Sequence, residues 1–523
     1  MIRQQNIRII YLVTLILLVL FIVLPIVNVL GLTFFGVGFS ENFKELNNDL
    51  LSLLFKSSLL ALSVAFFSTI SGVILGFILY KTNVKYRNFF KLLILIPLFI
   101  SPYILAIAWK DLSFFVFNSI EYDIYKKYSY FAIILVHSTI YIPLSILIIG
   151  SSMTNISKQL EESALLMTDF PNVFFKILIP LIKPAILSSF VLIFIFSISE
   201  FSVPSYFGIR VYTTEIFTQF SAFYNHGLAV LQSVLLIVLC MILLLSEKKH
   251  ISESTFLSVG TKGKEAKIYD SNRLNIIGFW IMITVVFIMI CLPVIVLILH
   301  SFVDGLDEFV KAFNLLLPSF GNSILLALLG AVCTVVIGFV AAYYSVRYNQ
   351  NTIDRILLFT FAIPSIILGI ALIKFYNKPY LNFIYSGLGI IILGYIGKYS
   401  FISAKIIRNS LKQIPKSMED AAKIQGVGYI KRIRKIVIPL IFPAIYAAFI
   451  INFLFCLGDL GTTIMVYPPG TEIMPIKVFT IMANAPDSLT SSMALIVFIF
   501  TILLISILFY TFKKILTEYN VNY

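Results

Sequence analysis

Charged residues are scarce in this chain of 523 residues, at 12% of the sequence, whereas soluble domains carry about 25%. The hydrophobic share is 59% and the mean hydropathy is +0.99. A soluble core cannot bury so much apolar surface, so the excess must face lipid. This composition excludes a soluble enzyme, a secreted disulfide scaffold and a disordered protein, and it indicates a polytopic membrane protein.

Cysteine and histidine are also rare, with four of each. The cysteines lie in apolar runs at unrelated spacings, without a CxxC pair or a His-rich tract, so we expect no stable metal site and no disulfide framework. The sequence has no G-x-x-x-x-G-K-[ST] loop for ATP, and its scattered histidines form no nucleophile–histidine–acid arrangement. We therefore expect a transport protein with no catalytic residues and no bound cofactor, not an enzyme.

Long apolar runs make up most of the chain. A bilayer core about 30 Å thick requires about 20 apolar residues as helix. The polar stretch 247–273 separates two sets of six such runs, which predicts an all-α membrane protein with about 12 transmembrane helices. The predicted spans are 9–33, 58–80, 92–109, 130–152, 184–207 and 228–246, then 274–302, 321–344, 356–377, 387–408, 443–467 and 492–512.

The basic residues indicate the orientation. With the N-terminus inside, the inner segments hold 28 of the 39 Lys and Arg residues. This asymmetry follows the positive-inside rule and predicts that both termini are cytoplasmic. Basic residues on the cytoplasmic side of the lipid bilayer account for the net charge of +14, so no nucleic-acid partner is expected.

An internal repeat lies after the fourth span of each set. Residues 155–186 read NISKQLEESALLMTDFPNVFFKILIPLIKPAI, and residues 413–445 read QIPKSMEDAAKIQGVGYIKRIRKIVIPLIFPAI. Glu162 matches Asp420 and Thr168 matches Gly426 at an offset of 258 residues, and Pro180 matches Pro439 at 259. Six spans separate the copies, so the two halves share one orientation and form parallel repeats.

The predicted halves are 1–246, with a core at about 55–246, and 274–523, with a core at about 316–512. The first loop is 155–184, the second loop is 413–443, and 247–273 is a cytoplasmic linker. Each loop suggests a short capped helix that projects from the membrane, with Ser417 and Asp420 resembling a capping box. Gly426 offers a break in the second loop.

The loops resemble the EAA motif, E-A-A-x3-G-x9-I-x-L-P, of permease subunits in binding-protein-dependent ABC importers. The second copy fits closely and the first more loosely, with Thr168 where the motif has Gly and one spacer residue fewer. The matching residues are Glu162, Ser163, Ala164, Thr168, Ile177, Ile179 and Pro180, then Asp420, Ala421, Ala422, Gly426, Ile436, Ile438 and Pro439.

The resemblance implies the fold of a type I ABC importer permease in the bacterial cytoplasmic (inner) membrane. It also implies that the loops are coupling helices that sit in clefts of separate ABC ATPase subunits, two copies in our interpretation, which use the ATP. An extracytoplasmic solute-binding protein would deliver the solute to the outer loops.

Two acidic residues lie within spans, Glu200 in the fifth and Asp459 in the eleventh, each 20 residues beyond the proline of its repeat. A carboxylate inside a membrane is costly unless it faces water or a partner. We expect both to line the pathway together with Tyr206 and Tyr467, although each acid could instead bond to a neighbouring helix.

These segments, with the outer stretches 211–220 and 468–482, look like the ferric-iron branch of the family. Hard Fe³⁺ prefers oxygen ligands, which the acids and tyrosines would offer transiently. Permeases for thiamine, 2-aminoethylphosphonate and polyamines share the pattern, so these solutes remain alternatives. A twelve-helix secondary carrier driven by an ion gradient is the alternative from another class, but such a carrier needs no paired loops of this kind.

Overall fold

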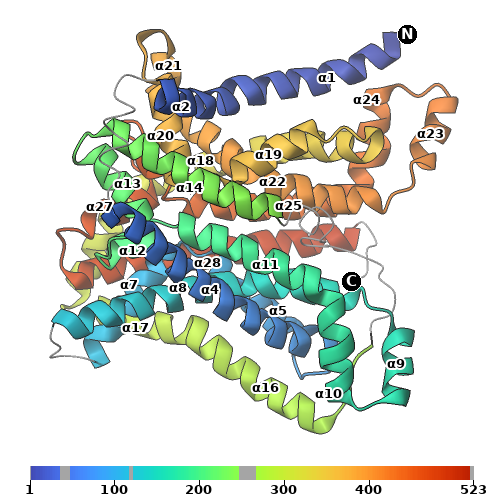
Figure 1. Cartoon of the computed structure of the whole chain (residues 1–523), viewed down its shortest axis with the longest axis horizontal. Coiled ribbons are helices and arrows are strands. Elements are labelled where there is room, and N and C mark those ends of the chain that lie inside the picture. Colours follow the sequence, from blue (N-terminus) through green and yellow to red (C-terminus); the bar gives the residue numbers. More distant parts are fainter. Residues whose placement is uncertain (1, 36–47, 117–121, 247–266, 519–523) are drawn as a thin grey trace.

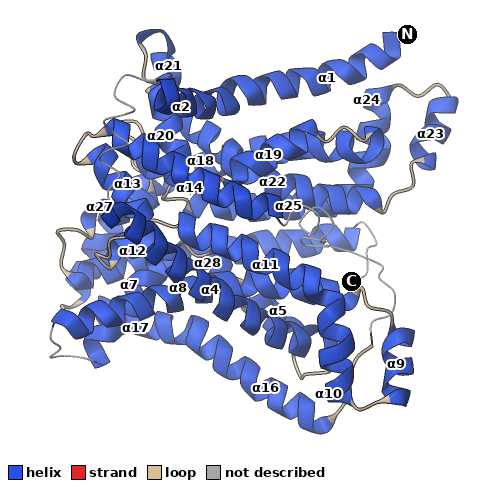
Figure 2. Ribbon diagram, in the orientation of Figure 1, coloured by secondary structure: helices blue, strands red, loops and turns tan. Residues whose placement is uncertain are grey.

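A computed structural model describes residues 2–35, 48–116, 122–246 and 267–518. Helices form its regular structure, as Figure 2 shows. Ten of these helices are long and apolar enough to cross a membrane, and two bent helix pairs raise the number to as many as twelve. The all-α fold with about twelve spans, predicted from the apolar runs, is therefore confirmed.

The helices of the first half are α1 (Ile2–Leu18), α2 (Leu24–Phe35), α4 (Asn48–Lys81), α5 (Arg87–Leu93), α6 (Ile96–Phe99), α7 (Pro102–Val116), α8 (Tyr122–Thr154), α9 (Lys158–Met167), α10 (Phe170–Val173), α11 (Ile179–Ser199), α12 (Ser202–Tyr206), α13 (Tyr212–Ser221) and α14 (His226–Ser246). Two π-helical turns, η1 (Val19–Val23) and η2 (Phe174–Leu178), join α1 to α2 and α10 to α11. Most of the predicted linker, residues 247–266, lies outside the described residues.

The second half repeats this order with α16 (Asn272–Val286), η3 (Phe287–Cys291), α17 (Leu292–Ser301), α18 (Leu306–Tyr348), α19 (Thr352–Ala362), α20 (Ser365–Tyr376), η4 (Pro379–Leu381), α21 (Asn382–Tyr385), α22 (Gly389–Lys412), α23 (Ser417–Ile424), α24 (Tyr429–Arg432), η5 (Ile433–Val437), α25 (Ile438–Gly458), α26 (Thr463–Val466), α27 (Met474–Ile481) and α28 (Asp487–Glu518). The start of α1 and the end of α28 lie at the same end of the bundle as α9 and α23 (Figure 1).

The third and ninth predicted spans are not straight helices. Residues 87–99 and 102–112 form one pair bent by 95°, and 352–362 and 365–376 form another bent by 106°. Pro102 begins the helix after the first break, and Pro364 lies within the second break. A residue before proline avoids the helical region, as Ile363 does at ψ 129°. The prediction of continuous spans at 92–109 and 356–377 was therefore wrong in shape, because it ignored Pro102 and Pro364.

The first helix of each half packs against the other half. The Tyr376 hydroxyl of α20 donates to the Phe21 carbonyl in η1 at 3.0 Å, and the rings of Tyr11 and Tyr344 lie 5.0 Å apart. Conversely, Phe279 of α16 packs on Phe90 of α5 at 5.9 Å, so α16 runs along the first half (Figure 1). The two halves are therefore interlocked.

The long helices α4 and α18 occupy equivalent places against α8 and α22. A Cβ atom added at Gly72 would lie 1.9 Å from the Ser145 hydroxyl oxygen, and one at Gly338 would lie 2.4 Å from the Ser403 Cβ. Both crossings need glycine because the neighbouring helix leaves no room for a side chain. The repeat seen in the sequence is thus present in the packing, well away from the loops.

Candidate functional site: two paired loops and a central cavity

The two predicted loops lie at the same end of the bundle, and each begins with a short helix (Figure 1). In the first loop, α9 carries Glu162, Ser163 and Ala164, and Thr168 ends it in an extended conformation at φ −159°. Pro180 lies in the first turn of α11.

In the second loop, α23 carries Asp420, Ala421 and Ala422. Gly426 follows with φ +82°, so the predicted break is present there. Ile436 lies in η5, and Pro439 lies in the first turn of α25.

The predicted capping box at the start of α23 is absent. Ser417 is already helical, Lys416 is the N-cap, and no side chain caps the helix. The backbone N–H groups of Glu419 and Asp420 both donate instead to the Lys416 carbonyl, at 3.0 and 3.1 Å. Backbone bonds therefore satisfy the groups that the Ser417 side chain was expected to satisfy.

The buried acid of each loop directly precedes the acid of the motif. Glu162 and Asp420 are exposed, whereas Glu161 and Glu419 are buried. The sequence interpretation missed these two residues. Two signals in the sequence could have found them. A glutamate stands in both copies at the same offset of 258, and a basic residue, Lys81 or Arg347, lies at the end of the long helix α4 or α18 of each half.

Glu161 fastens the first loop to the end of α4. Its carboxylate pairs with the fully buried Lys81 and accepts a hydrogen bond of 2.8 Å from the Tyr269 hydroxyl. Tyr269 belongs to the end of the linker, and its backbone N–H donates to the Lys81 carbonyl at 2.7 Å. Burial and the neighbouring carboxylate together raise the pKa of Tyr269, so its hydroxyl remains a donor.

Glu419 fastens the second loop to the end of α18 in the same way. Arg347 Nε lies 2.6 Å from Glu419 Oε1, and Arg347 Nη1 donates to the Ile414 carbonyl at 3.0 Å. The Tyr343 hydroxyl donates to the other carboxylate oxygen at 2.7 Å. Removing one partner of a buried pair leaves an uncompensated charge, so each loop must move with the helix that holds it.

Large apolar side chains project from the two loops. Leu166 and Met167 at the end of α9 are 90% and 88% exposed, and Ile424 at the end of α23 is 87% exposed. These positions are equivalent to within a residue in the repeat. Exposed apolar groups beside charged ones are typical of a surface that another protein covers.

The second feature is a cavity of about 250 Å³ between the two halves. Glu200 and Asp459 both line it, so the structure brings the two predicted acids to one place. The Ser101 hydroxyl, at the bend before α7, donates to the Gly458 carbonyl at 2.8 Å and joins the halves at this level. The rest of the lining is largely apolar, including Leu95, Leu98, Phe99, Ile100, Phe196 and Phe361.

Each acid also caps the turn that follows it. Glu200 accepts from the backbone N–H groups of Ser202 and Val203 at 2.8 and 2.9 Å, and its Oε2 lies 3.2 Å from His137 Nε2. A charged carboxylate is a strong acceptor for such donors. Glu200 therefore holds the break between α11 and α12 in place.

Asp459 has the equivalent arrangement in the second half. It accepts from the backbone N–H groups of Thr462 and Thr463 at 3.1 and 3.0 Å and from the Tyr399 hydroxyl at 2.6 Å. The alternative of bonds to a neighbouring helix thus applies as well, because His137 and Tyr399 belong to α8 and α22. Both acids face the cavity while they hold the broken helices.

Tyr206 and Tyr467 lie outside this lining. A short helix follows each acid and turns the chain away from the cavity. The side chain of Tyr467, which follows the second of these helices, is 37% exposed. Lys398 and Lys405 line the cavity instead. Lys398 donates to the carbonyls of Phe361 and Ile363 at the end of α19, and Lys405 Nζ lies 5.2 Å from the centre of the Phe401 ring.

Within the described residues, no three His, Cys, Asp or Glu side chains form a group that could hold a metal ion. The two acids come from opposite halves, and four donors already surround each carboxylate. Donors from the chain itself therefore already satisfy both carboxylates.

The chain matches a family described as "Binding-protein-dependent transport system inner membrane component" over residues 68–250 and again over 334–518. It is 25% identical to the Fe(3+)-transport system permease protein FbpB 2 of Haemophilus influenzae over 89% of this chain and 91% of that one. It is 22% identical to the ferric transport system permease protein FbpB of Actinobacillus pleuropneumoniae over 78% and 64% of the two chains.

A putative 2-aminoethylphosphonate transport system permease protein, PhnV of Salmonella typhimurium, is 25% identical over 35% of this chain and 68% of its own length. The two matched ranges cover most of the chain, one in each half. The chain therefore belongs to the binding-protein-dependent inner membrane transport components, as a multi-pass ABC importer permease that works with a binding protein and with partner ATPases that hydrolyse ATP.

Proposed function

We propose that this permease moves ferric iron from an extracytoplasmic binding protein into the cytoplasm. The observation that carries the proposal is the pair Glu200 and Asp459, which places one carboxylate from each half on the same cavity. Carboxylate oxygens suit a hard trivalent cation. The similarity to two ferric transport permeases over most of the chain supports the same substrate.

The paired loops suit the transmission of force from the ATPases. The first and second loops dock on two ATPase subunits, with Glu162, Asp420 and the exposed Leu166, Met167 and Ile424 at the contact. Because Glu161 and Glu419 bind the loops to α4 and α18, closure of the ATPases moves the core helices and opens the cavity outward. Both termini are then cytoplasmic, because the start of α1 and the end of α28 lie at the loop end of the bundle (Figure 1).

2-Aminoethylphosphonate is the second candidate solute. Lys398 and Lys405 give the cavity two ammonium groups, which would attract a phosphonate. The partial similarity to PhnV supports the same solute.

Uptake by cells that lack this chain distinguishes the solutes. We expect radiolabelled ferric iron uptake to fall while uptake of 2-aminoethylphosphonate, thiamine and polyamine is unchanged, and the intact gene should restore it. A selective loss of phosphonate uptake would instead favour the lysines as the solute contacts.

A double variant tests the two acids. Glu200→Gln with Asp459→Asn should slow iron uptake without weakening stimulation of the ATPases by the binding protein. Ser202→Ala is the matched control, because it removes a donor to Glu200 and leaves both charges in place. Equal slowing by both variants would show that the acids act by holding the helix break and not by contact with the solute.

A further inference from the structure

Helices α13 and α27 occupy equivalent places at the end of the bundle opposite the loops (Figure 1). The backbone N–H of Tyr212, the first residue of α13, donates to the Ser57 hydroxyl of α4 at 2.9 Å. The backbone N–H of Met474, the first residue of α27, donates to the Ser323 hydroxyl of α18, also at 2.9 Å. These matching bonds fix the register between the two helices at an offset of 262 residues.

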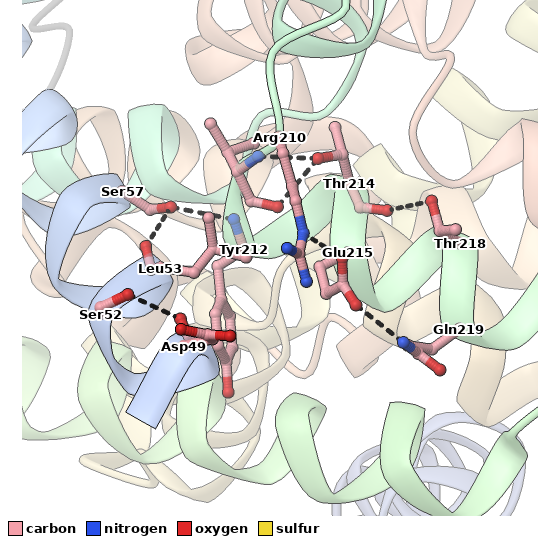
Figure 3. A network of polar contacts seen from close by, with 11 residues as sticks. Asp49, Ser52, Leu53, Ser57, Arg210, Tyr212, Thr214, Glu215, Thr218 and Gln219 are labelled. Atoms are coloured by element: carbon pink, nitrogen blue, oxygen red, sulfur yellow. Dashed lines mark hydrogen bonds and ion pairs between the residues drawn. The ribbon is translucent and has the colours of Figure 1, made fainter. Parts of the chain in front are cut away.

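In that register an ion pair recurs with its charges exchanged. Arg210 Nε lies 2.7 Å from Glu215 Oε2 in the first half, as Figure 3 shows. In the second half, Glu472 takes the place of Arg210 and Lys477 the place of Glu215, with 2.6 Å between Lys477 Nζ and Glu472 Oε1. The repeat has kept the pair and reversed its order.

The reversal changes the charge that faces solvent. The leading residue is the more exposed one in both pairs: Arg210 is 62% exposed against 6% for Glu215, and Glu472 is 41% exposed against 23% for Lys477. The more exposed member of the pair is therefore positive in the first half, where the exposed Asp49 lies near it, and negative at the same place in the second half.

Local stability does not explain the order. Both pairs span five residues across the start of a helix, whose N-terminus favours acidic and disfavours basic side chains. The helix end favours the order of the first half, where Glu215 lies in the first turn of α13, and disfavours that of the second half, where Lys477 takes this place. Helix stability therefore does not explain why the order is reversed in α27. The two orders also differ in the charge that a docked partner protein would contact.

The two helices both pack against a residue of the cavity lining. The Phe201 ring, which lines the cavity, lies 4.7 Å from the Phe217 ring of α13 and 5.8 Å from the Phe479 ring of α27. A partner that delivers solute to the cavity would therefore cover α13 and α27 together.

We propose that the Arg210–Glu215 and Glu472–Lys477 pairs fix the orientation in which the binding protein docks. One lobe of that protein presents acidic groups to Arg210, and the other presents basic groups to Glu472. Charges at the rim of an interface act mainly on the rate and orientation of association. The inference rests on the proposed orientation, with α13 and α27 outside.

Exchanging the two residues within an ion pair tests the proposal, because the ion pair remains while its exposed charge changes sign. Arg210→Glu with Glu215→Arg, and separately Glu472→Lys with Lys477→Glu, should each raise the binding-protein concentration for half-maximal ATPase stimulation by about tenfold at low salt. The shift should shrink in 0.5 M salt, because salt screens exposed charges. The probe is the loaded binding protein that stimulates the intact chain in proteoliposomes.

The matched control is the exposed pair Glu308 and Lys311 on α18, which lie 3.3 Å apart. Glu308→Lys with Lys311→Glu should leave the half-maximal concentration unchanged. An unchanged value in the two test swaps, or an equal shift in the control, would overturn the proposal. If another solute replaces iron, the assay is unaffected, so failure of the iron assignment remains distinguishable.

Crosslinking tests the orientation itself. A photoreactive label on Arg210→Cys should attach to one lobe of the binding protein, and the same label on Glu472→Cys to the other. Attachment of each label to both lobes equally would show that docking is not oriented by these pairs.

Discussion

The first and second loops are held by the same kind of contact, built from different parts of the chain. Both bury a glutamate against a basic residue at the end of a long core helix and add a tyrosine hydroxyl. In the second loop that hydroxyl is on Tyr343, within α18 itself. In the first it is on Tyr269, at the end of the linker between the halves.

This difference shows how a duplicated unit can diverge without losing a required contact. The second loop depends only on its own half. The first loop depends also on the end of the linker, which carries Tyr269. Lys267 of the same segment lies 3.7 Å from Glu162. Matched substitutions in the two loops should therefore differ in their effects.

Loss of the basic partner should have the largest effect and should be worse in the second loop. Arg347→Met leaves Glu419 buried without its cation, which costs about 3–5 kcal/mol, and it also removes the bond to the Ile414 carbonyl. Lys81→Met should cost less, because among the described residues the Lys81 ammonium group bonds to Glu161 alone. Thermal denaturation midpoints in detergent measure the difference.

Arg355→Met on α19 is the control, because Arg355 is an exposed arginine close to the same end of the bundle. It should leave the midpoint unchanged. A Lys81→Met variant less stable than Arg347→Met would contradict the ranking.

Removal of either hydroxyl should have a smaller and equal effect. Tyr269→Phe and Tyr343→Phe each remove one hydrogen bond to a buried carboxylate, which is worth about 1.5–3 kcal/mol. Because the two sites belong to separate loops, the losses should add in the double variant. Tyr224→Phe, at an exposed tyrosine, serves as the control, and clear non-additivity would mean that the loops are coupled.

A bulky residue in the turn after the short helix should impair coupling more in the second loop than in the first. Gly426→Val forces a β-branched side chain to adopt φ +82°, at a cost of about 1–2 kcal/mol, although the space around it is open. Thr168→Val meets no such strain, because Thr168 is extended. We expect Gly426→Val to uncouple ATP hydrolysis from uptake more strongly in reconstituted vesicles. Equal uncoupling would argue against unequal docking of the loops.

The smallest effect concerns pH at the opposite end of the bundle. Burial alone would raise the pKa of Glu215, but its bonds with Arg210 and Gln219 outweigh this and lower the pKa below its ordinary value of 4.5. A depressed carboxyl pKa adds stability that is present above the ordinary value and is lost as pH falls through the lower one. The protection factors of the α13 amides, which correct the exchange rate for its intrinsic pH dependence, should therefore stay high at neutral pH and fall only below pH 4.5. Loss of protection above that value would contradict the assignment.

The sequence alone supported the broad architecture because repeated, local patterns carry it. The apolar runs, the duplicated loops and the break at Gly426 are all present in the structure. Glu200 and Asp459 could be paired from their equal distance to the repeat prolines. Such features depend on periodicity and spacing, which a single sequence contains.

The remaining features depend on contacts between distant segments. Whether Glu161 or Glu162 is buried depends on how α9 turns on the end of α4, and spacing does not define that rotation. The packing of α16 on the first half and of α1 on the second is likewise non-local. Tyr206 and Tyr467 lie outside the cavity lining because the chain turns away after each helix break, and their part in the pathway stays a prediction.

ATP-dependent accumulation of radiolabelled ferric iron would decide whether this permease carries iron past Glu200 and Asp459. The chain is reconstituted in proteoliposomes with its ATPases and a loaded binding protein. We predict accumulation that needs ATP and the binding protein, and that falls sharply in the variant Glu200→Gln with Asp459→Asn but not in Glu308→Gln. Accumulation of 2-aminoethylphosphonate without iron, or iron uptake unchanged in the double variant, would contradict it.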